Sequence, residues 1–164
     1  MQAQRIEMLQ RMPIFGALSP SALEFLLAQT RLREVRAREF FFRQGEPACS
    51  MYVLETGEVS VRKSWRDRDF KLRTLGPGDC FGEMALMDLA DRSASVRADA
   101  DCVAIELSPD DLLRLYEHDV EQFALVQMNI GREVCRRLRV TDELLFQAMV
   151  GELPSSVDTV FQSL

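Results

Sequence analysis

Short apolar segments, each closed by a turn signal, fill the middle of the chain between residues 30 and 107. Residues 51–54 run into a turn around Gly57, and the sequence Gly-Pro-Gly-Asp at 76–79 interrupts the next apolar stretch. Glycine and proline clusters of this kind mark tight turns. The mostly charged residues 63–69 are expected to form the exposed tip of a hairpin. Short strands that alternate apolar and polar residues and turn this often are typical of a small sandwich or jelly roll.

Helical patterns flank this segment on both sides. Before it, Ser19 and Pro20 are predicted to be the N-cap and first residue of a helix. After it, Ser108 caps a short helix, and a longer helix is predicted from about Val120 to Met149, ended by Gly151 and Pro154. We therefore predict an α+β fold, in which an antiparallel β-roll or jelly roll is flanked by N-terminal helices and a long C-terminal helix. We divide the chain into a helical segment 1–28, a β-roll 29–118, a long, dimerising helix 119–150 and a tail 151–164.

Length, charge and hydropathy narrow the possible partners. The 164 residues suit one domain, and 47% of them are hydrophobic, which is enough for a core. The net charge of −6 argues against nucleic acid as the main partner, because a phosphate backbone requires a basic surface. No apolar run approaches the roughly 20 residues of a membrane span, and the N-terminus does not resemble a signal peptide. We expect a cytoplasmic protein that contacts no membrane.

Cysteine and histidine content gives little support to metal chemistry. Cys49, Cys80, Cys102 and Cys135 form no Cys-x-x-Cys pair, so we expect free, buried thiols rather than a metal or iron–sulfur site. The single histidine, His118, cannot build the centre of a metal-dependent phosphohydrolase. No nucleophile–base pair of recognisable spacing is present. We therefore expect no metal, no cofactor and no enzymatic activity.

The stretch between residues 81 and 96 carries the chemistry. Gly82 lets a backbone approach a ligand closely, and residues 83–88 can form one helical turn whose free N–H groups attract an anion. Arg92 adds a fork of donors that suits phosphate oxygens, beside the hydroxyl of Ser93 and the N–H of Ala94. A carboxylate beside a phosphate suits a sugar hydroxyl, which gives Glu83 a role. Alternatively, Glu83 and Arg92 form an ion pair in a loop.

These residues resemble the phosphate-binding cassette of the cyclic nucleotide-binding domain family, which includes catabolite activator-type regulators and kinase regulatory subunits. The family pattern Phe-Gly-Glu-x-Ala-Leu is matched at 81–86 and Arg-Ser-Ala at 92–94, and the resemblance extends over about residues 12–143. It implies that Glu83 binds the ribose 2′-hydroxyl, that Arg92 binds the cyclic phosphate and that Ser93 supports it. Asp91 stands where many members have proline. The candidate ligand-binding residues are Phe81, Gly82, Glu83, Met84, Ala85, Arg92, Ser93, Ala94, Arg137 and Thr141.

The long helix resembles the helix that pairs across a two-fold axis in catabolite activator-type regulators. In that resemblance a polar residue at the place of Thr141 reaches the adenine, whereas Asp142 departs from the family and leaves base selectivity open. Alternatively, Thr141 bonds its own helix backbone and the arginines at 136–139 form a solvated face. We predict a homodimer seam, although part of its stripe could instead cover the chain's own β-roll. The stripe consists of Phe123, Ile130, Val134, Leu138, Thr141, Leu145 and Ala148.

The leading hypothesis is a regulatory module that binds cAMP, possibly cGMP, and acts on an effector protein whose identity the sequence does not give. The second hypothesis is a scaffold or interaction domain that keeps the fold without binding a nucleotide, and a phosphodiesterase is a distant third. The chain has no room for a helix-turn-helix domain, so we expect no direct DNA binding. If the chain is complete, it is a stand-alone sensor that acts through a partner protein, and if it is a fragment, the effector segment has been cut away.

Overall fold

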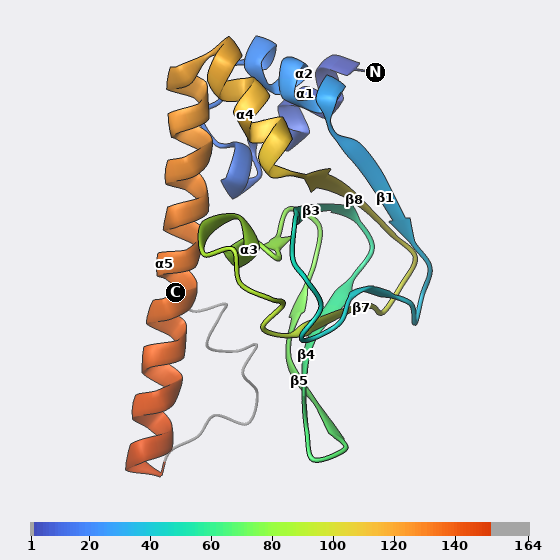
Figure 1. The fold of residues 1–164 in the computed structure, drawn as a ribbon, viewed down its shortest axis with the longest axis vertical. Coiled ribbons are helices and arrows are strands. Elements are labelled where there is room, and N and C mark those ends of the chain that lie inside the picture. Colours follow the sequence, from blue (N-terminus) through green and yellow to red (C-terminus); the bar gives the residue numbers. More distant parts are fainter. Residues whose placement is uncertain (1, 152–164) are drawn as a thin grey trace.

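The computed structural model describes residues 2–151, whose strands form two antiparallel sheets of four strands each (Figure 1). One sheet has the strand order β1-β8-β3-β6 and the other β2-β7-β4-β5. Helices gather at one end of the sheets, and the long helix α5 runs along one side (Figure 1). The strands are β1 (Arg31–Val35), β2 (Phe40–Phe42), β3 (Met51–Thr56), β4 (Val59–Trp65), β5 (Arg68–Leu75), β6 (Cys80–Phe81), β7 (Ser95–Ala98) and β8 (Cys102–Leu107).

Turn chemistry sets the strand connections as the sequence predicts. Gly57 links β3 and β4 with φ of 94°, and a Cβ there would lie 2.5 Å from the carbonyl oxygen of Asp101. Only glycine fits this left-handed, crowded position. The β4–β5 hairpin turns at Arg66 and Asp67, which both have positive φ, and its tip projects from the end opposite the helices (Figure 1). The predicted exposed hairpin tip is therefore confirmed.

The helices begin and end at capping residues. Ser19 caps α2 by accepting a bond from the Ala22 N–H, and Ser108 and Asp111 form a capping box at α4. Helix α5 ends at Gly151, which has φ of 79°. The helices are α1 (Gln2–Gln10), the 3₁₀ turn η1 (Pro13–Phe15), α2 (Pro20–Gln29), α3 (Met84–Met87), α4 (Pro109–His118) and α5 (Val120–Val150).

Two apolar clusters hold these layers together. One joins α1, η1, α2, α4 and the first half of α5 to one face of β3 and β8, and the other fills the space between the two sheets. Val126 and Ile130 of α5 are fully buried in the first cluster. Asn129, between them, donates its side-chain amide to the carbonyls of Ile14 and Gly16. The first half of α5 is thus fixed to the domain by apolar burial and by satisfied backbone groups.

The second half of α5 lies along the sheets with part of its apolar stripe open. Leu138 is 58% exposed and Leu145 is 60% exposed. The predicted stripe therefore divides: around Ile130 it is buried against the chain's own domain, and from Leu138 onward its side chains are exposed. The buried part agrees with the alternative in which the stripe covers the chain's own domain, and the homodimer seam stays a prediction for the exposed part.

The predicted α+β fold class is confirmed, and one detail of the sequence prediction is wrong. All four cysteines are free, but only Cys80 and Cys102 are buried, whereas Cys49 and Cys135 are exposed. Cys49 and Cys135 are exposed because Cys49 lies in the loop before β3 and Cys135 lies on an outward face of α5. Among the described helices, none is both long and apolar enough to cross a membrane. The predicted tail, apart from Gly151, lies outside the described residues.

Candidate ligand-binding site

The predicted cassette folds into a strand, a single helical turn and a loop that returns to the sheet. Cys80–Phe81 is β6, Met84–Met87 is α3, and Arg92 lies just before β7. Gly82 joins strand to helix with φ of 74°, and a Cβ on it would lie 2.5 Å from Arg92 Nη1. Glycine at position 82 therefore makes room for the guanidinium of Arg92.

Arg92 is a buried cation whose side chain lies against Phe42. Its guanidinium carbon is 3.9 Å from the centre of that ring, and it donates to the carbonyls of Ser50 at 2.7 Å and Gly82 at 3.2 Å. Its Nε is buried without a hydrogen-bond partner, and no ion pair within residues 2–151 joins Arg92 to a carboxylate. Burial lowers the pKa of Arg92, but an arginine remains charged at neutral pH. The site thus contains a desolvated positive charge that a bound anion would compensate.

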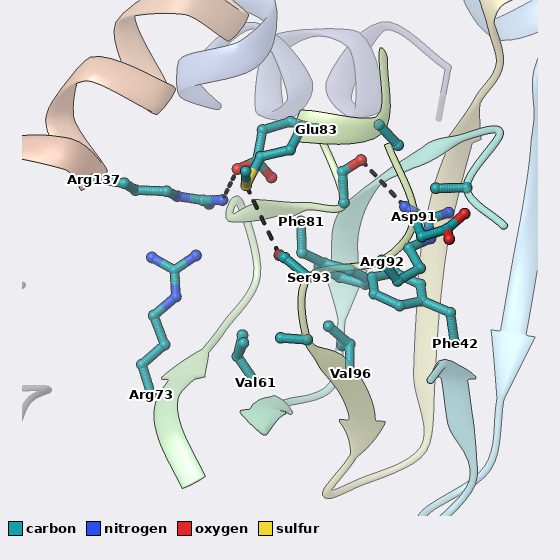
Figure 2. A pocket seen from close by; sticks show the side chains of 15 residues that line it. Phe42, Val61, Arg73, Phe81, Glu83, Asp91, Arg92, Ser93, Val96 and Arg137 are labelled. Carbon is teal, nitrogen blue, oxygen red and sulfur yellow. Dashed lines mark hydrogen bonds and ion pairs between the residues drawn. The ribbon is translucent and has the colours of Figure 1, made fainter. Parts of the chain in front are cut away.

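Glu83 pairs with α5 instead of with Arg92. Its carboxylate is buried and lies 2.6 Å from Arg137 Nη1. Figure 2 marks this ion pair with a dashed line. Arg137 also pairs with Glu133 at 2.6 Å and donates to the carbonyl of Cys80. Burial works against the charge of Arg137, but Glu83 and Glu133 hold its pKa above the usual value. The alternative of a Glu83–Arg92 ion pair is therefore wrong, and Arg137 is not part of a solvated face.

Two adjoining cavities lie between this cassette, the β4–β5 hairpin and α5. The inner cavity is about 100 Å³ and contacts Arg92, Ser93 and Gly82. The outer cavity is about 520 Å³ and reaches Leu138 and Thr141 on α5. The inner one alone is smaller than the roughly 300–1,000 Å³ of typical ligand sites, but the outer one is within that range. The two share the lining residues Val61, Arg73, Glu83, Met84, Ser93, Ala94 and Arg137, so one ligand can extend through both.

Each of the ten residues predicted to bind ligand lines at least one of these cavities. Phe81 does so as a core residue, since its ring packs against Phe41, Phe42 and Tyr52. Thr141 faces the outer cavity, but its hydroxyl donates to the carbonyl of Arg137 at 3.0 Å. This is the backbone bond that the sequence offered as the alternative for Thr141. Its contact with a base stays a prediction.

Sequence reasoning missed Arg73, which lines both cavities from β5. Arg73 pairs with Val61 across the hairpin, so the two side chains share one face of the sheet. Burial, followed by the charge of Arg137, lowers the pKa of Arg73 to about 10. The alternation of residues along β5 could have indicated this face, but the pairing register with β4 was needed to place Arg73 beside Glu83.

Comparison with known proteins agrees with this geometry. Residues 32–119, just over half of the chain, match the family model of the cyclic nucleotide-binding domain. The cyclic AMP receptor protein of Thermus thermophilus is 32% identical over 79% of this chain, and a CRP-like cAMP-activated global transcriptional regulator of Mycobacterium tuberculosis is 28% identical over 92%. The crystal structure of Thermus thermophilus catabolite activator protein superposes with a TM-score of 0.74 at 30% identity, covering 84% of this chain and 63% of that one.

This chain belongs to the cyclic nucleotide-binding domain family. It spans 59% of the length of the Thermus receptor protein and 66% of the Mycobacterium regulator.

Proposed function

We propose that this chain is a regulatory module that binds a cyclic purine nucleotide and acts on a partner protein, and that it is not an enzyme. The observation that carries the proposal is Arg92, a buried cation at the inner cavity that has no carboxylate partner among residues 2–151. Beside it, the hydroxyl of Ser93 and the start of the α3 turn add donors for one phosphate. The names of the relatives make cAMP the first ligand to test.

The remaining contacts follow from the size and chemistry of the two cavities. With the cyclic phosphate at Arg92, the ribose meets the buried carboxylate of Glu83, and the base enters the larger outer cavity. Glu83 would then accept a hydrogen bond from a ribose hydroxyl while it is still held by Arg137. Any change in that ion pair alters how α5 is held against the domain. Ligand binding is thereby coupled to the helix.

A homodimer that pairs along the second half of α5 is part of the proposal. Leu138, Leu145 and Phe146 are each 58–60% exposed, which is unusual for large apolar side chains on one helix. Leu138 also lines the outer cavity, so a ligand and a dimer contact would meet at one residue. The proposed signal to an effector protein is a change in this helix pairing.

Calorimetric titration tests the proposal directly. We expect cAMP or cGMP to bind with one site per chain, and 5′-AMP, which lacks the cyclic phosphate, to bind far more weakly. Incubation with excess cAMP and divalent metal ions should yield no AMP. A protein that keeps its fold but binds neither cyclic nucleotide would support the scaffold hypothesis instead.

A further inference from the structure

A third cavity lies outside the cassette, between η1, the turn before β6 and the middle of α5. Its volume is about 480 Å³, which is within the range of small-molecule sites. Pro13 of η1, Asp79 of the turn and Arg132 of α5 all line it. It shares no lining residue with the inner or the outer cavity, so it is separate from the proposed nucleotide site.

Two of the charged side chains at this cavity are paired with each other. Glu133 accepts two hydrogen bonds from the guanidinium of Arg136, at 2.8 and 3.0 Å, and a third from Arg137 at 2.6 Å. Both oxygens of this carboxylate are therefore occupied. The Arg136–Glu133 pair offers a ligand no net charge.

The other two charged side chains, Arg132 and Asp79, have no ion-pair partner within residues 2–151. Arg132 donates from Nη1 to Asn129 Oδ1 at 3.0 Å, which leaves its Nε and Nη2 without a hydrogen bond in the described part of the chain. Asp79 accepts from the Gly76 N–H at 2.9 Å on Oδ2, and its Oδ1 has no hydrogen bond to any described residue. One unpaired cation and one unpaired anion thus line the same cavity from different segments.

This pair of charges favours a ligand that carries a charge of each sign. An anion alone would bind Arg132 but meet the like charge of Asp79, and a cation alone would meet the opposite conflict. A free α-amino acid is charged at both ends at pH 7. Its carboxylate matches the planar fork of a guanidinium, and its ammonium group supplies three donors to a carboxylate. The ring of Pro13 provides an apolar surface for the ligand's side chain.

Both charged groups are held in place before a ligand arrives. Asn129 is buried and donates its amide to the carbonyls of Ile14 and Gly16, so the oxygen that positions Arg132 is itself fixed. Asp79 is held at the turn by its carboxylate and by its own N–H, which donates to the carbonyl of Gly76 at 3.0 Å. Groups that are already ordered cost less conformational entropy when a ligand binds.

We infer that the third cavity is a binding site for a free α-amino acid, with the ligand's carboxylate on Arg132 and its ammonium group on Asp79. This site is additional to the proposed cyclic nucleotide site and does not depend on it. An amino acid with an apolar side chain fits the cavity best, because no further unpaired charge of the described residues lines it.

The test is a thermal-shift series of the whole chain with each of the standard L-amino acids, followed by calorimetric titration of those that raise the melting temperature. At least one amino acid should bind with one site per chain. Its N-acetyl derivative lacks the ammonium charge and its amide lacks the carboxylate charge, so each should bind at least about tenfold more weakly. Saturating cAMP should not displace it, since the two sites share no lining residue.

Two conservative variants locate the binding. Asp79→Asn keeps an oxygen that can accept from the Gly76 N–H, and Arg132→Gln keeps a donor for Asn129, so both should fold as judged by circular dichroism. Each should weaken amino-acid binding by roughly tenfold to a hundredfold, because a charge-assisted contact is lost. Arg139→Gln removes an exposed arginine of α5 that lines none of the three cavities and should bind as the wild type does. Arg92→Ala should also bind the amino acid normally.

Three results would overturn the inference: no amino acid binds, the N-acetyl derivative or the amide binds as tightly as the free amino acid, or both variants keep wild-type affinity. If Asp79→Asn does not fold, Arg132→Gln decides alone. A protein that binds cAMP but no amino acid loses this inference and keeps the proposed function. A protein that binds an amino acid at this site but no cyclic nucleotide does the reverse.

Discussion

The inner and outer cavities are built in different ways. The inner cavity comes largely from one continuous segment, in which Gly82 and Arg92 are ten residues apart and touch each other. The outer cavity is assembled from β4, β5 and α5, so that Val61 and Thr141 face one space from opposite halves of the chain. The proposed contacts to the phosphate therefore come from residues close together in the sequence. The proposed contacts to the rest of the ligand come from segments that only the tertiary structure brings together.

The difference also concerns what holds each wall in place. At the inner cavity, Arg92 is fixed by two backbone carbonyls and the Phe42 ring. At the outer cavity, α5 is tied to the cassette by Arg137, and beyond that pair Leu138 is largely exposed. The proposed phosphate end of the site is thus preformed, whereas the proposed base end depends on how the second half of α5 packs.

Arg92→Ala breaks the inner cavity and should have the largest effect. A hydrogen bond to a charged group contributes about 1.5–3 kcal/mol, and a fork that makes two contributes more. The affinity for cyclic nucleotide should fall by roughly a hundredfold or more. Calorimetry measures this loss, with Arg33→Ala, an exposed arginine on β1, as the control that should bind normally. Wild-type affinity in Arg92→Ala would contradict the assignment of the phosphate site.

Leu145→Glu tests whether the exposed second half of α5, which forms one wall of the outer cavity, pairs with a second chain. Leu145 is 60% exposed on α5 and lies outside the residues that line either cavity, unlike Leu138. If two chains pair here, the substitution removes about 1.5–3 kcal/mol of apolar burial and brings like charges together. The dimer dissociation constant, measured by sedimentation, should rise at least about tenfold. A monomeric wild-type protein, with and without ligand, would show that this face is not a dimer seam.

The features that could be predicted from the sequence are those built, like the inner cavity, from residues close together in the chain. Residues 81–94 form a local motif that resembles the phosphate-binding cassette. The roles expected of Gly82 and Arg92 follow from their spacing in this motif and from that resemblance. The two sheets, the capped helices and the end of α5 at Gly151 were also predicted, since turns and caps are local signals. Each of these features depends on residues only a few positions apart.

Arg73 and the partner of Glu83 could not be predicted in this way. Arg73 occupies a strand whose neighbours Leu72 and Lys71 are exposed, and its place depends on the β4–β5 register. The Glu83–Arg137 pair joins residues 54 positions apart through the packing of α5 against the cassette. The hydrogen bonds from Asn129 to the carbonyls of Ile14 and Gly16 hold α5 on the domain, and no single segment contains this information.

Glu83→Gln should have an intermediate effect, at the junction of the two cavities. Glutamine keeps an acceptor for the ribose hydroxyl but loses the charge that strengthens the bond, so the affinity for a cyclic nucleotide should fall about tenfold. The 2′-deoxy analogue has no such hydroxyl and should lose little. Titration of both ligands into both proteins gives the comparison. Equal losses for the two ligands would assign Glu83 a structural role through Arg137.

Thr141→Val should have the smallest effect, because the side chain already satisfies its hydrogen bond within α5. In the structure the hydroxyl donates to the carbonyl of Arg137. A bound base could therefore form at most one hydrogen bond with Thr141, by donating to the hydroxyl oxygen. One neutral hydrogen bond contributes about 0.5–1.5 kcal/mol, which corresponds to a loss of affinity of about twofold to tenfold. Valine has the shape of threonine and should leave thermal stability nearly unchanged.

Thr141→Ser is the matched control, since it keeps the hydroxyl and loses only a methyl group. If binding is measured for the three proteins, the serine variant should resemble the wild type. A hundredfold loss in Thr141→Val, equal to that of Arg92→Ala, would mean that ligand binding turns the hydroxyl away from the Arg137 carbonyl and onto the base. The outer cavity would then be as specifically built as the inner one, and its α5 wall would have to rearrange when the ligand enters.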